Sequence, residues 1–366
     1  MRAHALKGNS SEQNSFSFMR LALSTIVLAG HAAILSGSRT VLSIGKIPLT
    51  AICVFCFFAL SGFLVAPGLL RNGVRYYIFR RVSRIYPAYL GVLASVAFGF
   101  SWIWQILSPA KNFNICQSLK YIFINILPPP GIFNQESRHI NFLSGQPIGV
   151  PLSGFSNGSL WSLSLEFMAY VSLAGIFCST RRDRTLFNKI INIVVMTILF
   201  WAIIFSVCYS RLYFKSPTFF EAVFSKWPYL LCFFIGVGLN FWPKHKSSKN
   251  VFTLLSLIIF VSASFNILLF AIVGAAALTY LVIQVGESRA FVKIPLKLDI
   301  SYGIYLYHYP VEQTFAHFRF LRENLILFIL LSIIFSSMFA YLSAKFIEVP
   351  IQRKAQEWIA RDHAQS

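Results

Sequence analysis

The uncharged stretch IPLTAICVFCFFALSGFLVAPGLL, residues 47–70, decides the fold class of this chain. A helix needs about 20 apolar residues to cross about 30 Å of hydrocarbon, and this stretch is long enough. It lacks the alternation of apolar and polar residues that a membrane-spanning β-strand would show. Because backbone polar groups in lipid must be hydrogen-bonded within the segment, we expect a transmembrane helix here.

Similar apolar runs recur along the whole chain. The 366 residues are 56% hydrophobic and include 38 Phe, but only 12% are charged, against about 25% in soluble domains. The sequence therefore predicts an all-α integral membrane protein of about ten transmembrane helices. We place these helices at residues 18–36, 47–70, 84–107, 159–179, 188–209, 227–241, 251–264, 267–285, 299–317 and 325–347.

The number of crossings depends on how residues 251–285 are divided. We divide them at 262–266, which gives ten helices and leaves most Lys and Arg residues on the side of both termini; nine helices would spread these residues almost evenly. The positive-inside rule favours ten, with both termini cytosolic. The expected organisation is a cytosolic tail 1–17, a membrane domain 18–349 in the inner (plasma) membrane with an outer loop 108–158, and a basic cytosolic tail 350–366.

The formal charge of +20 does not indicate a nucleic-acid partner. Lys and Arg lie mostly in short breaks between apolar runs, whereas a nucleic-acid interface gathers them on one folded surface. Cys53 and Cys56 form a CxxC pair, but no second Cys or His pair lies close enough in the sequence to complete a metal site. We therefore expect the lipid bilayer as a partner, no nucleic acid and no metal.

The first predicted helix carries two ionisable residues, Arg20 and His31. They are eleven residues apart, or about three helical turns, so both side chains share one face and are separated by roughly 16 Å along the axis. Ionisable groups at membrane depth are costly and usually functional. Arg20 could bind a phosphate-bearing donor at the cytosolic side, or it could only fix the orientation of the helix in the membrane. His31 could take part in catalysis, or it could only form a hydrogen bond to a neighbouring helix.

The expected cytosolic loop after the second helix is rich in arginine. Five arginines lie within residues 71–84, and guanidinium groups suit phosphate contacts. Arg81 and Arg84 are spaced to point the same way on a helix. A donor site and contact with anionic lipid headgroups both fit this segment when it is taken alone. Arg75 and Arg80 belong to the same group of candidate donor contacts.

Two later helices each carry a polar stripe at helical spacing. In the fourth helix the stripe consists of Ser159, Ser162, Glu166 and Tyr170, with Trp161 beside them. In the ninth helix it includes Tyr305 and His308, and Tyr302 lies on an adjacent face. Two histidines and buried carboxylates suit acyl transfer, since a neutral imidazole can remove the proton of an attacking hydroxyl and a carboxylate can orient that imidazole.

Several segments together resemble the membrane acyltransferase-3 family, which includes O-antigen and exopolysaccharide O-acetyltransferases. The resemblance covers residues 16–353. It rests on Arg20-x10-His31, Phe57-Phe58-Ala-Leu-Ser61-Gly62-Phe63-Leu64, Arg81-Val-Ser-Arg84, Trp161-Ser-Leu-Ser-Leu-Glu166, Ser301-Tyr302-Gly-Ile-Tyr-Leu-Tyr-His308-Tyr-Pro310 and Glu348-Val-Pro350.

The resemblance implies an acyl-CoA-dependent O-acyltransferase that moves an acyl group, expected to be acetyl, from cytosolic acyl-CoA to a hydroxyl of a carbohydrate. Candidate acceptors are a cell-surface polysaccharide, O-antigen, lipopolysaccharide or lipid-linked sugar. The alternative is a transporter or flippase for a glycan or lipid-linked sugar. The candidate residues are His31, Arg20, Glu166 and His308 for catalysis, Arg81, Arg84, Arg80 and Arg75 for the donor, and Ser162, Tyr302, Tyr305 and Trp161 for the acceptor.

Overall fold

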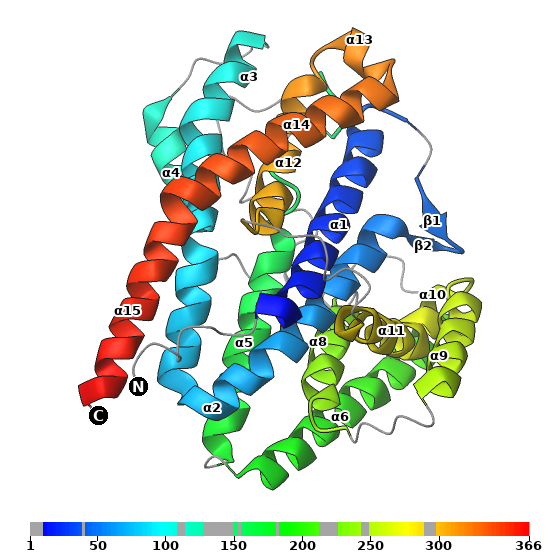
Figure 1. Cartoon of the computed structure of the whole chain (residues 1–366). Coiled ribbons are helices and arrows are strands. Elements are labelled where there is room, and N and C mark those ends of the chain that lie inside the picture. The colour runs from blue at the N-terminus through cyan, green and yellow to red at the C-terminus, as the bar shows by residue number, and fades with distance from the viewer. Residues whose placement is uncertain are drawn as a thin grey trace.

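A computed structural model of the chain describes residues 10–38, 41–107, 114–126, 149–152, 155–180, 183–211, 226–242, 249–288 and 298–365. These residues are almost entirely helical (Figure 1). The helices before residue 226 are α1 Ser10–Leu35, α2 Leu49–Ala94, α3 Ser101–Leu107, α4 Ile115–Asn125, α5 Trp161–Ser179 and α6 Arg184–Arg211. The later helices are α8 Trp227–Leu239, α9 Lys249–Ala263, α10 Ile267–Leu269, α11 Ala275–Glu287, α12 Ser301–Phe315, α13 Arg319–Arg322, α14 Leu325–Ser343 and α15 Val349–Gln365.

Short irregular elements join some of these helices. Segments of π-helix, Ser95–Phe100, Phe270–Gly274 and Ala344–Glu348, make α2–α3, α10–α11 and α14–α15 continuous. The strands among the described residues are β1 Ser43–Ile44 and β2 Ile47–Pro48, which pair antiparallel with Ser43 opposite Pro48 and Ile44 opposite Ile47. The predicted all-α class is therefore confirmed for this part of the chain.

Five helical segments among the described residues are long and apolar enough to cross a membrane. They are Ser15–Leu35, Leu49–Leu107, Trp161–Ser179, Ile267–Glu287 and Leu325–Asp362, and two shorter apolar helices are Trp227–Leu239 and Asn250–Ala263. The helical break expected at 262–266 is confirmed, because α9 ends at Ala263 and α10 begins at Ile267. Asn266 caps the new helix by accepting hydrogen bonds from the backbone N–H groups of Leu268 and Leu269.

The interpretation of residues 71–83 as a loop is wrong. Helix α2 continues through them to Ala94, and only Gly73 has non-helical backbone angles, with φ 77° and ψ 175°. This left-handed conformation is open mainly to glycine. Figure 1 shows the two arms of α2 diverging at a sharp bend. The arginine-rich segment is therefore held on a rigid helix instead of a loop.

Two parts that the sequence left without structure are also helical. The expected outer loop 108–158 contains α4, whose Tyr121 is fully buried, while residues 108–113, 127–148 and 153–154 lie outside the described residues. The expected C-terminal tail forms α15, which packs along α2 (Figure 1). There Arg75 pairs with Asp362 at 3.1 Å and lies 5.0 Å from the centre of the Trp358 ring.

The largest apolar core lies between α2, α5, α8 and α11. Phe55 stacks on Tyr229 at 4.1 Å between ring centres, and Phe233 is fully buried beside them. Close packing of α2 on α8 depends on Gly62, because a Cβ there would lie only 2.0 Å from the carbonyl oxygen of Phe233. The Ser61-Gly62 pair therefore combines a packing position with a polar side chain at the edge of a cavity.

Candidate active site

A cavity of about 1530 Å³ opens between α1, α2, α5 and α12. Its walls combine guanidinium groups with hydroxyl and carboxyl groups, so it differs from the apolar core around it. The polar residues on its walls include Arg20, Arg81, Arg84, Glu166, Asp299 and Tyr305. Ser162 and Tyr302 also line it. The structure thus brings together seven of the twelve candidate residues, which come from four separate helices.

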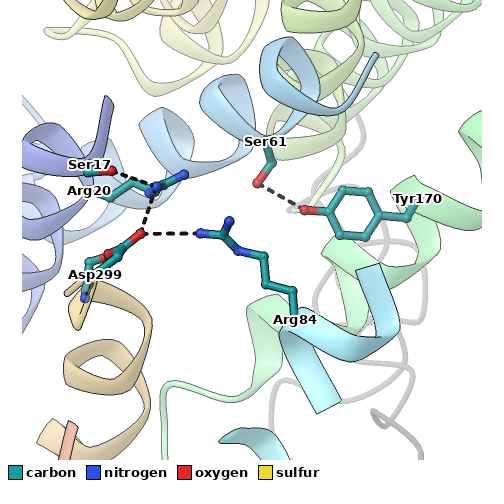
Figure 2. Close-up of polar contacts among 7 residues, drawn as sticks. Ser17, Arg20, Ser61, Arg84, Tyr170 and Asp299 are labelled. Atoms are coloured by element: carbon teal, nitrogen blue, oxygen red, sulfur yellow. Dashed lines mark hydrogen bonds and ion pairs between the residues drawn. The ribbon is translucent and has the colours of Figure 1, made fainter. Parts of the chain in front are cut away.

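One carboxylate joins two of the arginines (Figure 2). Oδ2 of Asp299 accepts a hydrogen bond from Arg20 Nη2 at 2.8 Å and lies 3.4 Å from Arg84 Nη2. Arg20 also donates to Ser17 Oγ at 3.2 Å. The guanidinium group of α1, that of α2 and the carboxylate just before α12 therefore form one ion-pair network.

The other oxygen of Asp299 is held by its own helix. Oδ1 accepts hydrogen bonds from Ser301 Oγ at 2.5 Å and from the Ser301 backbone N–H at 3.2 Å. Backbone N–H groups at a helix start have no partner within the helix, so a carboxylate here is stabilised. The position of Asp299 is thus set by the start of α12 as well as by the two arginines.

Glu166 forms a second polar cluster in the cavity. Its Oε1 accepts hydrogen bonds from Ser61 Oγ at 2.6 Å and from the Tyr170 hydroxyl at 2.5 Å. The Tyr170 hydroxyl also lies 3.3 Å from Ser61 Oγ, a contact that Figure 2 shows. The Arg81 guanidinium lies 5.9 Å from the centre of the Tyr170 ring. Glu166 is therefore held in place by two hydroxyl donors, one from α2 and one from its own helix.

The two polar stripes predicted on α5 and α12 meet at one contact. Ser162 Oγ and the Tyr305 hydroxyl are 2.7 Å apart. The Tyr302 hydroxyl donates to the Ile85 carbonyl at 3.2 Å, which ties α12 to α2. The Tyr305 ring, in turn, lies 6.0 Å from the His308 ring between centres. Tyr305 therefore stands between the cavity and the histidines.

The two predicted histidines form a direct pair. Nδ1 of His31 lies 2.8 Å from Nε2 of His308, and the ring centres are 5.1 Å apart with 4° between the ring planes, so the two rings are nearly coplanar and meet edge to edge. Nδ1 of His308 lies 3.1 Å from the Ile304 carbonyl, which can only accept a hydrogen bond. In the neutral pair, Nδ1 of His308 therefore carries a proton and donates to the Ile304 carbonyl, and Nε2 of His308 accepts a hydrogen bond from Nδ1–H of His31. Nε2 of His31 then keeps its lone pair.

Arg20 and His31 do share one face of α1, as predicted, because both contact α12. Only Arg20 of this pair lines the 1530 Å³ cavity, because His31 and His308 are not among its lining residues. His308 is fully buried and His31 is half-buried behind Tyr305. Helices α1 and α12 run side by side in the same direction, with an ion pair at one level and the histidine pair at another.

Three further candidates lie outside the cavity lining. Arg75 is engaged with α15, and Arg80 is an exposed residue on the outside of α2. Trp161 packs against Tyr229 at 5.3 Å between ring centres, and the Lys226 ammonium lies 3.9 Å from the centre of its ring. These residues do not touch the cavity that holds Arg20, Arg81 and Arg84.

The sequence places Tyr170 on the polar stripe with Glu166 but gives no separate role to Asp299 or Ser61, and the structure brings all three into the polar clusters of the cavity. The contact between Tyr170 and Glu166 agrees with the spacing of four residues that put both on that stripe. No local signal links Asp299 to Arg20, because they are 279 positions apart in the chain.

The fold and this cavity define a helical protein of the membrane with a polar site between its helices, and comparison with known proteins identifies its class. The chain belongs to the acyltransferase-3 family, whose acyltransferase domain matches residues 13–345. This confirms the predicted resemblance. Of the two hypotheses drawn from the sequence, it supports the first, because the protein is an acyltransferase.

Two relatives carry more specific names. An O-acetyl transferase of Shigella phage Sf6 is 25% identical over 314 residues, which cover 83% of this chain and 86% of the phage protein. A putative peptidoglycan O-acetyltransferase of Bacillus subtilis (strain 168) is 26% identical over 343 residues, covering 81% of this chain and 49% of that protein. No solved structure matches this chain.

Proposed function

We propose that this acyltransferase moves an acetyl group from cytosolic acetyl-CoA to a hydroxyl of a cell-surface carbohydrate. The observation that carries the proposal is the arrangement along α1 and α12, where a guanidinium-lined cavity is followed, behind Tyr305, by a histidine pair with a free ring nitrogen. The names of the two relatives support acetyl as the group and a glycan as the acceptor.

The donor's phosphates would bind Arg20, Arg81 and Arg84. Arg20 and Arg84 converge from α1 and α2, and Arg81 lies one turn before Arg84 on the same cavity wall. Guanidinium groups bind phosphate oxygens through paired N–H donors. The long thin arm of coenzyme A suits the roughly 16 Å that separate Arg20 from His31 along α1. Arg75 and Arg80 are less suited, since neither lines the cavity.

His31 would act as the general base of the transfer. Its Nε2 takes the proton of the acceptor hydroxyl as that oxygen attacks the thioester carbonyl carbon. The carbon–sulfur bond then breaks, and the proton passes from His31 to the leaving thiolate, so the products are the acetyl ester and free coenzyme A. His308 would orient His31 by accepting a hydrogen bond from its Nδ1–H group, and the Ile304 carbonyl would fix His308 in turn.

The acceptor would approach the histidines from the side opposite the donor. The candidate acceptor residues Ser162, Tyr302 and Tyr305 line the donor cavity instead, and the Tyr305 ring also lies beside His308. The Ser162–Tyr305 hydrogen bond would have to open, or the Tyr305 ring turn aside, for the thioester to reach His31. Trp161 could stack on a sugar only after Lys226 moves from its ring face.

Two contacts between helix ends fit ten crossings with both termini in the cytosol. Ser15 Oγ donates to the Ser288 carbonyl, so the start of α1 and the end of α11 lie at one level. At the other level, the Lys46 N–H donates to the Ser264 carbonyl, which joins the segment after α1 to the turn after α9. If the ten predicted helices cross in alternating directions, Ser15 and Ser288 both lie on the cytosolic side, and Lys46 and Ser264 both lie on the outer side. The basic residues on the side of both termini support a cytosolic placement of that side, and we place the protein in the inner (plasma) membrane.

Transfer in proteoliposomes tests this proposal. The purified protein is supplied with radiolabelled acetyl-CoA on one side and candidate glycans on the other. We expect His31→Ala to abolish label transfer, because the base is lost. His317→Ala serves as the matched control, since this histidine lies just after the end of α12 and is hydrogen-bonded to the Gln313 carbonyl. Wild-type transfer by the His31→Ala protein would refute the mechanism.

A further inference from the structure

The donor cavity contains an anion of its own. Asp299 lies on the cavity wall, and its Oδ2 occupies the place between Arg20 and Arg84 where a phosphate oxygen would bind. Its side chain is 29% exposed, so it is open to the cavity and not sealed in the core. Any phosphate that uses these two guanidinium groups must therefore share their N–H donors with a carboxylate.

Asp299 is held by a second set of contacts besides the two arginines. Its Oδ1 is fixed by the hydroxyl and the backbone N–H of Ser301, at the start of α12. A carboxylate that swings on a long, free side chain could leave when a ligand arrives, but this one is short and held at its second oxygen. Asp299 therefore stays close to the two arginines when the cavity fills.

The arginines, by contrast, keep donors for a ligand. The side chains of Arg20 and Arg84 line the cavity and are 20% and 39% exposed, so both guanidinium groups remain accessible from it. Arg81 adds a third guanidinium group to the same cavity, directed over the Tyr170 ring. The cavity can therefore bind phosphate groups while Asp299 remains, but against the repulsion of a fixed negative charge a few ångströms away.

We propose that Asp299 is an internal competing anion, which weakens the binding of the donor and of the coenzyme A product alike. This rests on the proposed function, because it requires a donor with phosphate groups in this cavity. Both molecules carry the same phosphates, so Asp299 acts on them equally and does not change the transition state relative to bound substrate. Its effect is to raise the donor concentration needed for half-saturation and to speed the release of free coenzyme A.

The rival interpretation makes Asp299 a positioning residue. The two interpretations predict opposite changes in coenzyme A affinity when Asp299 is replaced. If Asp299 mainly holds the two guanidinium groups in a geometry that phosphates need, its removal weakens binding. If Asp299 mainly competes, its removal strengthens binding. The fixed anchor on Ser301 favours competition, because the carboxylate cannot move away from the phosphates.

Binding of radiolabelled coenzyme A, measured by equilibrium dialysis of the full-length protein in nanodiscs, decides between them. Asp299→Asn keeps an oxygen that can accept from Ser301 but removes the charge. We expect it to bind coenzyme A about tenfold more tightly, a change of about 1.4 kcal/mol in binding free energy. In acetyl transfer we expect a lower KM for acetyl-CoA and a kcat that is unchanged or reduced by slow product release.

Asp362→Asn is the matched control, because Asp362 also pairs with an arginine but lies between α2 and α15, outside the cavity. It should leave coenzyme A affinity unchanged. Asp299→Ser, which has a shorter side chain, should also bind coenzyme A more tightly. Size-exclusion profiles and thermal unfolding check that each variant is folded.

Weaker or unchanged binding in the folded Asp299 variants would overturn this inference and leave the proposed function intact. Absence of saturable coenzyme A binding in the wild type and in both variants would overturn the proposed donor, and this inference with it.

Discussion

Nδ1 of His31 lies 2.8 Å from Nε2 of His308, although the two residues are 277 positions apart in the chain. This pair joins α1 to α12 at one level, and Arg20 joins the same two helices through Asp299 at another. Two polar bridges therefore fix these neighbouring helices relative to each other. A movement of α12 that disturbed the ion pair would also disturb the histidines.

The first prediction concerns the role of His308. His308→Gln can still present an amide oxygen to the Nδ1 proton of His31, whereas His308→Ala leaves that proton without a partner. Loss of one hydrogen bond of about 1.5 kcal/mol corresponds to about tenfold in rate. We therefore expect kcat to fall at least about tenfold in the Ala variant and less in the Gln variant. Equal rates for both variants in the proteoliposome assay would argue against an orienting role.

The second prediction concerns the arginines of α2. Arg81→Ala combined with Arg84→Ala should raise the acetyl-CoA concentration at half-saturation and change kcat less, because these residues would hold the phosphates and not the reacting atoms. Arg80→Ala is the matched control, since Arg80 is exposed and does not line the cavity. A donor titration in which the double variant and the control coincide would discard the phosphate clamp.

The third prediction concerns Glu166. Glu166→Gln keeps the size of the side chain but replaces a carboxylate that accepts from two hydroxyl groups. We expect acetyl transfer to fall at least about tenfold, as hydrogen bonds to charged groups are worth about 1.5–3 kcal/mol. Tyr170→Phe removes one of the two donors and should have a smaller effect. Full activity of Glu166→Gln would reduce this residue to a packing role.

The fourth prediction concerns the bend in α2. Gly73→Ala should destabilise the protein by about 1–3 kcal/mol, because alanine is strained at the backbone angles of Gly73. Gly68→Ala, within the helical part of the same element and with no atom near the added methyl group, should be neutral or slightly stabilising. Thermal unfolding of both variants in detergent checks this. Similar melting temperatures for the two variants would mean that alanine is not strained at position 73.

Much of the fold could be predicted from the sequence because it follows from local composition. Long uncharged runs indicate helices in lipid, and the break at 262–266 is marked by Ser and Asn residues that interrupt such a run. The spacing of polar residues also placed Ser162 and Tyr305 on stripes, which the structure brings within 2.7 Å of each other.

The remainder depends on contacts that no local pattern reveals. Residues 71–83 carry charges that suggested a loop, but they continue a helix that extends past the apolar run and packs against α15. The ion pair of Arg20 with Asp299 and the pairing of the two histidines each require α12 to lie beside α1. Helical spacing gives the face on which a residue lies, but not the helix that this face meets.

The most direct test of the account is a structure of the His31→Ala protein with acetyl-CoA bound. We predict the phosphates within hydrogen-bond distance of Arg20 and Arg84, and the thioester carbon beyond Tyr305, facing the space that the His31 ring leaves. Phosphates bound on the outer surface of α2 at Arg75 and Arg80, or a thioester end directed away from α1, would contradict it.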